Sequence, residues 1–181
     1  EPPETMAGKI EEHRVTLMEA AAEGDDELIM KYLEGEELSD DEIRQGLKAA
    51  ILNGDVVPVF CGAATQPLGI APLMNAFLNL APSPAEVGTV MAQGVKGEEE
   101  IAPDASGTLA ALIFKTMADP YVGKLSYFRV YGGTLVSDDR YFNSRAGEEE
   151  RVGQIYSMRG KEQLPVVHMV AGDIGAVAKL N

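Results

Sequence analysis

Residues 115–135 read KTMADPYVGKLSYFRVYGGTL, and this stretch decides the fold of the C-terminal part of the chain. Residues 124–131 are rich in aromatic and β-branched side chains, which is typical of a strand. The pair Gly132–Gly133 follows them and precedes the residues TLVS, where a tight hairpin turn is expected. The sequence therefore predicts two neighbouring strands joined at the two glycines.

Other short β-rich runs lie on both sides of this stretch. They cover residues 108–117, 140–143, 151–157, 166–170 and 174–180. Asp138–Asp139 and Ala146–Gly147 mark reversals between them. Because these short strands follow one another without helices, residues 107–181 are predicted to form a small antiparallel β-barrel or sandwich.

The N-terminal part of the chain has the pattern of acidic helices. Apolar residues at helical spacing predict a helix over residues 6–23, and Asp25 and Asp26 can cap a second helix. Ser39 and Glu42 have the S-x-x-E spacing of a capping box, which predicts a third helix that ends at Gly54.

Residues 56–61, VVPVFC, form an apolar, β-branched run of the kind found in buried strands. Pro72 suits the first turn of a helix that stops before Pro82. A strand, a loop and a helix are half of a βαβ unit, so we expect residues 1–82 to be a partial α/β domain from a longer protein. Residues 83–106 are rich in Pro, Gly and charge and are predicted to be a linker.

Charge is distributed unevenly along the chain. The 181 residues include 15 Lys and Arg against 29 Asp and Glu, a formal charge of −14. Residues 1–103 contain 20 acidic and 6 basic residues, whereas residues 104–181 contain 9 of each. This asymmetry indicates two units with different partners. No apolar run is long enough to span a membrane, so we expect a soluble, cytoplasmic protein with no membrane partner.

The sequence gives little support for a catalytic or metal-binding role. A P-loop requires G-x-x-x-x-G-K-[ST], and both Gly123–Lys124 and Gly160–Lys161 lack the first glycine and the final Ser or Thr. The single cysteine, Cys61, ends an apolar run, where we expect a buried, inert thiol. We therefore predict no catalytic residue, no metal site and no tightly bound nucleotide in this chain.

Charged residues indicate two kinds of surface. Acidic pairs such as Glu11–Glu12 are typical of a solvated face, and an acidic helix with an apolar edge also attracts basic partners. In the predicted barrel, basic and aromatic residues are interleaved. They are Lys124, Arg129, Arg140, Arg145, Arg151, Arg159 and Lys161, with Tyr127, Tyr131, Tyr141 and Tyr156. Such a mixture suits contacts with the phosphates and bases of a nucleic acid.

Residues 115–135 resemble the start of domain II of elongation factor G, the GTPase of ribosomal translocation. Four further segments resemble the same family in the same order, so the resemblance covers essentially the whole chain. Residues 17–43 look like the end of the G′ insertion, residues 58–64 like the last G-domain strand with its guanine-contacting loop, residues 78–84 like the G-domain exit, and residues 170–180 like a late strand of domain II. RGKEQ at residues 159–163 looks closer to the elongation factor G-like paralogues.

The resemblance implies a mixed α and β fold. It divides the chain into a helical and partial α/β G-domain remnant (1–82), a linker (83–106) and a translation-factor domain II β-barrel (107–181). Gly62, Ala63 and Ala64 match the family's fifth GTPase motif, a Gly-Ser-Ala loop that faces guanine, with alanine in place of serine. GTP and magnesium are implied for the full-length parent, and neither is expected for this chain, because the other nucleotide motifs would lie upstream.

Two partner surfaces are also implied. The acidic G′ helices would dock the ribosomal stalk protein, and the barrel would contact small-subunit ribosomal RNA or the remaining domains of the parent. The candidate residues are Glu19, Glu23, Asp25, Asp26 and Glu27 for the stalk, and Lys124, Arg129 and Arg151 for RNA or interdomain contacts.

The function implied is that of an elongation factor G-type GTPase that promotes translocation, of which this chain would be a non-catalytic fragment for ribosome docking and interdomain packing. Two alternatives stay open. One is an elongation factor G-like paralogue that binds or protects ribosomes without translocase activity. The other is an independent acidic protein-interaction module.

Overall fold

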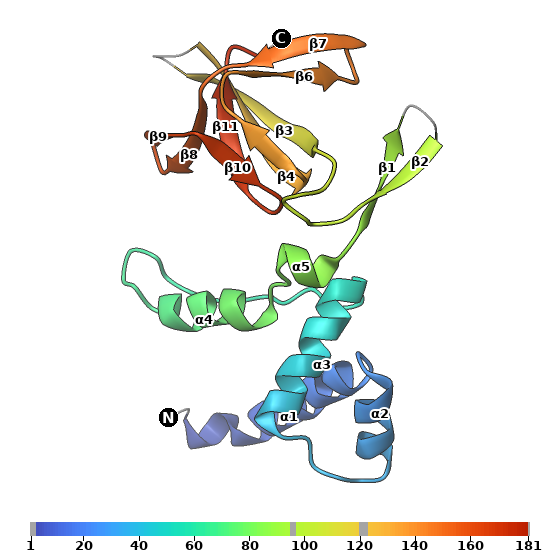
Figure 1. The fold of residues 1–181 in the computed structure, drawn as a ribbon. Helices are drawn as coiled ribbons and strands as arrows, with labels where there is room; N and C mark the ends of the chain where they lie inside the picture. Colours follow the sequence, from blue (N-terminus) through green and yellow to red (C-terminus); the bar gives the residue numbers. More distant parts are fainter. Residues whose placement is uncertain (1–2, 95–96, 120–122, 181) are drawn as a thin grey trace. The chain divides into compact units, whose positions relative to one another are not determined.

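The computed structural model describes residues 3–94, 97–119 and 123–180. The chain divides into two compact units, Glu1–Pro82 (unit 1) and Ser83–Asn181 (unit 2). Unit 1 is helical, whereas unit 2 is built mainly from strands (Figure 1). Among the described residues, no helix is both long and apolar enough to cross a membrane.

Unit 1 is formed by helices whose ends the local sequence specifies. They are the 3-10 turn η1 (Glu4–Met6) and helices α1 (Ala7–Ala22), α2 (Asp26–Leu33), α3 (Asp40–Asn53) and α4 (Ile70–Leu80). The Asp25 carboxylate accepts hydrogen bonds from the amides of Glu27 and Leu28 and so caps α2. Ser39 and Glu42 form the predicted capping box of α3.

The core of unit 1 is small and lies where α1, α2 and α3 meet. It consists of Ala22, Leu28 and Leu38, with Tyr32 and Ile43 packed against them. Only the C-terminal end of α1 contributes. Ala21 and Ala22 are its buried residues, whereas Met6 and Leu17 are each 49% exposed.

Residues 56–61 do not form the buried strand that their sequence predicts. They belong to no strand, and Val57 and Val59 are 81% and 86% exposed. Cys61, predicted to be buried, is also exposed. A β-branched run becomes a buried strand only where neighbouring strands pair with it and cover it. No such neighbour exists within the described residues of unit 1, so the expected partial α/β domain is seen here as helices without a sheet.

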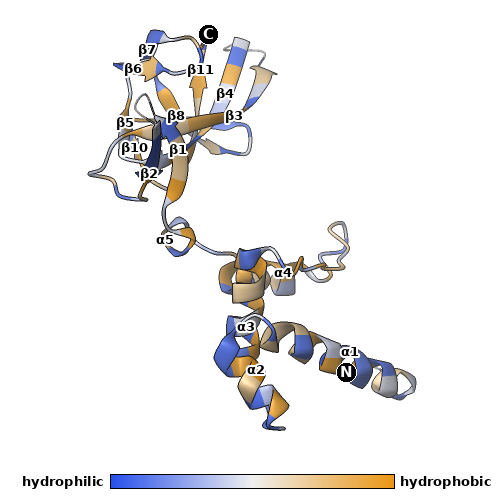
Figure 2. Cartoon of the chain, turned by 90° about the vertical axis from the view of Figure 1, so that its right-hand side faces the viewer, coloured by the Kyte–Doolittle hydropathy of each residue, from blue (hydrophilic) through white to orange (hydrophobic). Residues whose placement is uncertain are grey.

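Helix α4 also keeps its apolar residues on the surface. It begins at Ile70, after Gly69 in a left-handed conformation, and Pro72 lies in its first turn. None of its residues is buried, and Phe77 and Leu78 are 55% and 79% exposed. Figure 2 shows hydrophobic residues along this helix. Unit 1 therefore presents an extended segment and a helix with uncovered apolar side chains.

Unit 2 is an antiparallel strand domain. Its elements are α5 (Pro84–Val87), β1 (Val90–Gly94), β2 (Gly97–Ile101), β3 (Ala110–Asp119), β4 (Gly123–Gly132), β5 (Thr134–Val136), β6 (Asp139–Asn143), β7 (Glu148–Val152), β8 (Ile155–Arg159), β9 (Glu162–Val166), β10 (His168–Val170) and β11 (Ile174–Ala178). A five-stranded sheet has the order β3-β4-β11-β8-β9, and the pairs β1-β2, β5-β10 and β6-β7 complete the unit. The expected fold class, mixed α and β with a small antiparallel barrel, is confirmed.

The strands of unit 2 surround one hydrophobic core. It contains Phe128, Val130, Leu135, Val152, Ile155, Met169, Val177 and Leu180. Along β4 the buried residues alternate with half-buried ones, as the two-residue period of a strand requires. A register shift between Ile113 and Lys115 marks a bulge in β3, and such bulges bend a sheet.

The structure differs from the predicted strand pattern at three places. Gly132 and Gly133 do not join a hairpin, because β4 pairs with β3 and β11 while β5 pairs with β10. The runs 151–157 and 166–170 each contain parts of two strands. The predicted linker 83–106 contains α5 and the β1-β2 hairpin.

Steric crowding explains why glycines are found where the chain passes from β4 to β5. Gly133 has φ +70°, and a Cβ there would come within 2.6 Å of the Leu109 Cα. The glycines thus let the chain leave one sheet for another where residues 107–109 pack closely against it.

Candidate functional site

Figure 1 labels strands β6 and β7, which form a hairpin. Two arginines lie directly opposite each other on this hairpin. Arg140 pairs with Arg151, and Phe142 pairs with Glu149 in the same register. Residues directly opposite each other in an antiparallel pair share one face, and like charges in that position destabilise the pair. We call Arg140, Phe142 and Arg151 the hairpin surface. All three are exposed, and Phe142 is 59% exposed.

The opposite face of the hairpin is anchored in the core. Tyr141 packs against the core and its Oη accepts a hydrogen bond from the Val136 amide at 2.8 Å. Val152 is one of the core residues. Because the alternate residues are held inward, the arginines between them must point outward.

Two carboxylates lie near this charge: Glu149, which is exposed on the same face opposite Phe142, and Asp138. Arg151 Nη2 lies 3.1 Å from Asp138 Oδ1. Asp138 has φ 63°, in the left-handed region at the turn between β5 and β6. Both side chains are more than half exposed, so the ion pair is weak and leaves Arg151 open to competing anions.

A second cationic feature is an open depression of about 450 Å³ lined by Lys124, Asn143, Arg145 and Ala146. Asn143 shapes it, because its Oδ1 accepts hydrogen bonds from the amides of Arg145 and Ala146 at 3.0 and 3.1 Å. Its Nδ2 donates to Glu150 at 2.9 Å. The Lys124 and Arg145 side chains are exposed and are the two charged groups that line the depression.

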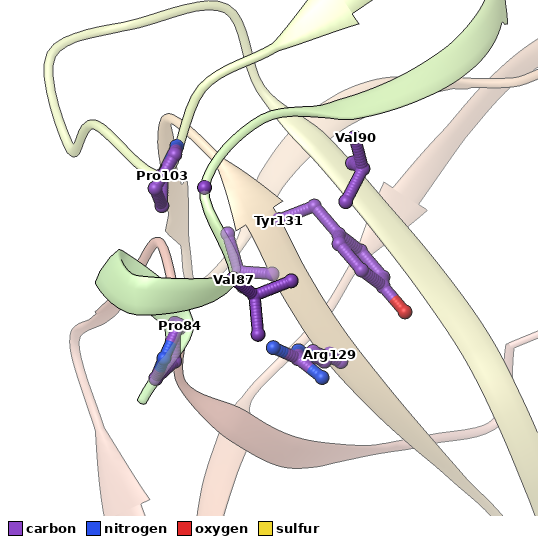
Figure 3. A pocket seen from close by; sticks show the side chains of 9 residues that line it. Pro84, Val87, Val90, Pro103, Arg129 and Tyr131 are labelled. Atoms are coloured by element: carbon purple, nitrogen blue, oxygen red, sulfur yellow. The ribbon is translucent and has the colours of Figure 1, made fainter. Parts of the chain in front are cut away.

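Arg129 lies apart from these exposed cations. It is half-buried, and its Cζ lies 4.9 Å from the centre of the Tyr131 ring. The two side chains lie beside Val87 and Val90 in Figure 3. The three predicted RNA or interdomain contacts therefore occupy three settings: Lys124 in the depression, Arg151 on the hairpin surface and Arg129 beneath residues 84–90.

The sequence named Arg140 and Arg145 only within the wider set of basic barrel residues, and it did not indicate Phe142 or Asn143. The signal was present, because three arginines lie within the predicted strands and turns of residues 139–152. Pairing Arg140 with its partner on β7 required the register, which depends on where β7 begins.

The five acidic stalk candidates lie around the corner between α1 and α2. Glu19, Glu23, Asp26 and Glu27 are exposed. The Glu19 carboxylate accepts a hydrogen bond from the Tyr32 hydroxyl at 3.1 Å. Asp25 is half-buried and is occupied by capping α2, so its first role is structural. The four exposed residues form a negatively charged edge beside the first turn of α2. They are Glu19, Glu23, Asp26 and Glu27.

Residues 62–69 form a closed loop. The Ala63 amide donates to the Leu68 carbonyl at 3.0 Å, and the Leu68 amide donates back at 3.1 Å. The Ala63 amide is therefore already used. In the described part of the chain the amides of Gly62 and Ala64 have no backbone acceptor, and neither residue is buried.

The structure brings together no group suited to phosphates or magnesium in this loop. Across residues 3–94, 97–119 and 123–180 no cluster of three or more His, Cys, Asp or Glu side chains could hold a metal ion. The DASG sequence of residues 104–107 is a turn, in which Asp104 accepts hydrogen bonds from the Ser106 amide and hydroxyl. These hydrogen bonds lower the pKa of Asp104.

Two comparisons with known proteins add to this geometry. Residues 108–181 match the family model described as elongation factor G domain 2. The chain also resembles a crystal structure from Thermus thermophilus, with a TM-score of 0.71 and 29% sequence identity. That match covers 99% of this chain and 24% of the Thermus chain, so this chain spans about a quarter of that protein's length.

Proposed function

We propose that the chain serves ribosome docking and interdomain packing in a translational GTPase that promotes translocation, because residues 108–181 match the family model of elongation factor G domain 2. The hairpin surface and the depression beside it are the proposed contacts with small-subunit ribosomal RNA. The acidic edge of unit 1 is the proposed contact with the ribosomal stalk protein.

The observation that carries the RNA proposal is the Arg140–Arg151 pair. Like charges directly opposite each other weaken a hairpin, so this pair has a cost in the isolated domain. A phosphate backbone removes that cost, because it neutralises both guanidinium groups and releases counterions. Phe142, exposed on the same hairpin, offers a face on which a base can stack.

Salt-dependent binding tests this proposal. We expect the chain to bind purified small ribosomal subunits in a filter assay, with affinity that falls as salt rises. Arg140→Gln and Arg151→Gln should each weaken binding and each reduce the slope of log affinity against log salt by about 1. Phe142→Ala should weaken binding with little change in that slope, because it removes stacking and no charge.

Arg159→Gln is the matched control for the arginine variants. Arg159 is an exposed arginine of the same unit, paired with Glu162 on the β8-β9 hairpin. The control removes the same charge outside the proposed surface, so its effect on the salt slope should be clearly smaller. Equal loss in all three arginine variants would mean that net charge, and no particular surface, determines binding.

The stalk proposal rests on the charge and exposure of the α1–α2 corner. Exposed Glu19, Glu23, Asp26 and Glu27 create a negative edge that favours a basic partner. Reversing Glu19 and Glu23 to Lys should weaken association with the stalk protein, most strongly at low salt. The control is Glu11→Lys with Glu12→Lys, which makes the same charge change elsewhere on α1. A purely solvated acidic surface would give no difference between the two pairs.

The nucleotide proposal concerns a longer protein that contains this chain. Gly62, Ala63 and Ala64 are its proposed guanine loop, which the free amides of Gly62 and Ala64 support. GTP would supply the phosphoryl group and magnesium the charge neutralisation, and both would depend on residues outside this chain. The uncovered apolar side chains of residues 56–60 and α4 are the proposed packing face toward the remaining domains of that protein.

A paralogue that binds or protects ribosomes without translocase activity would use the same surfaces. A ribosome-dependent translocation assay on a full-length protein distinguishes the two, because only a translocase moves the messenger RNA. An independent acidic interaction module would instead show no dependence of ribosome binding on Arg140 or Arg151.

A further inference from the structure

Arg129 is the unusual cation of unit 2. It lies on the outward face of β4, and residues 84–90 cross over it. Pro84, Val87 and Val90 line a cavity with Arg129 and Tyr131 (Figure 3). The other lining residues are Gly88, Pro103, Val130 and Gly172, so Arg129 is the one charged group in the wall.

The guanidinium group of Arg129 has one buried N–H without an acceptor in the described part of the chain. Its Nε is buried and has no hydrogen-bond partner. No carboxylate among the described residues forms an ion pair with it. The Tyr131 ring stabilises the positive charge through its face, yet a ring contact does not accept the in-plane N–H groups of the guanidinium. An arginine cannot lose its proton to escape this situation, so the buried N–H calls for an oxygen acceptor.

We propose that this cavity is an oxyanion site, in which one oxygen of a phosphate group accepts hydrogen bonds from Arg129. The cavity has a volume of about 10 Å³, which is about the space that one water-sized group needs. A phosphate can insert one oxygen and leave the others in water. A carboxylate bound in the bidentate manner needs room for two oxygens side by side.

Occupation of this site is coupled to the docking of residues 84–90. Pro84, Val87, Gly88 and Val90 form one side of the cavity, and β4 forms the other. Docking of this segment buries the Arg129 Nε, and an inserted oxygen satisfies it. Phosphate therefore holds the segment against β4. None of the cavity residues belongs to the hairpin surface, so this site and the RNA proposal can fail independently.

Nuclear magnetic resonance of the whole chain tests the site directly. The Arg129 Nε–H signal, assigned by its loss in Arg129→Lys, should move saturably when inorganic phosphate replaces chloride at constant ionic strength. Hydrogen exchange of residues 84–90 should slow over the same phosphate range. Arg159→Lys, which alters an exposed arginine paired with Glu162, should leave both responses unchanged.

The other outcomes overturn the proposal. An Arg129 signal that does not respond to phosphate would exclude the site, and so would an equally large response to acetate at the same ionic strength. If phosphate also slows the hydrogen exchange of residues 84–90 in the Arg129→Lys variant, phosphate acts at another site.

A second arm distinguishes the sources of the phosphate group. A short single-stranded oligoribonucleotide is titrated at matched phosphate concentration. A response to inorganic phosphate but none to the oligoribonucleotide assigns the site to small phosphate compounds. A response to both assigns it to accessible backbone phosphates as well. Either result retains the oxyanion site, and absence of both removes it.

Discussion

Gly46 sets how closely helices α1 and α3 approach each other. A Cβ at this position would overlap the carbonyl group of Ala21, and a Cβ on Gly24 would overlap the carbonyl oxygen of Gly46. The obstacles are backbone atoms, which cannot rotate away as a side chain can. Two glycines from different segments thus create one close crossing, and the small core of Ala22, Leu28 and Leu38 depends on it.

Gly46→Ala should lower the free energy of unfolding of unit 1 by about 1–3 kcal/mol, because the helices must separate. Urea unfolding followed by far-ultraviolet circular dichroism measures it, since the long helices lie in unit 1. Gly8→Ala is the control, because this glycine is also helical and a Cβ there would meet nothing within 4 Å. That change should be neutral or stabilising by up to about 1 kcal/mol. Similar losses in both variants would contradict the steric explanation.

Glu42 links α2 and α3 and makes the stability of unit 1 depend on pH. Its carboxylate accepts hydrogen bonds from Lys31 Nζ at 2.6 Å and from the Ser39 amide at 2.8 Å. The Lys31 hydrogen bond, followed by those from Ser39, lowers the pKa of Glu42 from 4.5 to about 2. The folded form holds the charged carboxylate more strongly than the unfolded chain does. This contribution is therefore complete above about pH 4.5 and disappears as the pH falls toward 2.

Glu42→Gln should reduce the loss of stability of unit 1 between pH 4.5 and pH 2. Urea midpoints across this range measure the effect, and the carboxyl carbon shift of Glu42 reports its pKa directly. Glu11→Gln, at an exposed position on α1, serves as the control for removal of one acidic group. A Glu42 titration midpoint near 4.5 would refute the assigned hydrogen bonds.

The β1-β2 and β6-β7 hairpins of unit 2 differ in how they are anchored. The β6-β7 hairpin places Val152 in the core and Tyr141 against it. In the described part of β1-β2, Ile101 is the one buried residue. A two-stranded hairpin is at best marginally stable by itself. Anchoring, and not strand length, should therefore decide which of the two opens more often.

Hydrogen exchange measures this difference. Amides of β1 and β2 should exchange faster than those of β6 and β7, and both should exchange faster than β4 and β11 inside the five-stranded sheet. The β6-β7 pair is a fair comparison, because each of its strands has five residues, as do β1 and β2. Equal protection of the two hairpins would show that Ile101 alone suffices as an anchor.

The sequence predicts elements well where the deciding interactions are local. The caps at Asp25 and Ser39 formed as expected, because each involves residues two or three positions away. The prediction of a strand at residues 56–61 was wrong, because a strand requires partner strands far along the chain. Gly132–Gly133 marked a real change of direction, and the pairing of β5 with β10 depends on residues 168–170.

The same distinction applies to the candidate site. Composition identified the basic and aromatic residues of the barrel, and Lys124 and Arg151 are exposed there. Which cations face each other depended on the register of β6 and β7. Burial of Arg129 depended on residues 84–90, which are far away along the chain and which the sequence indicated as a linker. Neither the facing pair of arginines nor the burial of Arg129 could be predicted from residue spacing alone.

At the scale of the whole molecule, the charge of −14 belongs to residues 1–103, while residues 104–181 are neutral. An average over the chain would argue against any contact with RNA. Considered separately, the two parts suit different partners, because a segment without net charge can display local cationic surfaces without repelling a phosphate backbone over long distances.

The whole chain should not bind GTP saturably at micromolar concentrations. The proposed guanine loop of residues 62–64 would contribute contacts to the base alone, whereas affinity for a nucleoside triphosphate comes mostly from phosphate and magnesium contacts. Titration with a fluorescent GTP analogue, monitored by anisotropy, checks this expectation. Saturable micromolar binding that is lost on adding unlabelled GTP would contradict it.

The exposed thiol of Cys61 gives the molecule a natural reporter position. It is the one cysteine in the sequence, and it directly precedes Gly62. A maleimide fluorophore or a nitroxide spin label will therefore attach at a single site without any substitution. Its emission or spectral line shape would report whatever approaches the closed loop of residues 62–69. Assembly with other domains could then be followed in real time on an otherwise unaltered chain.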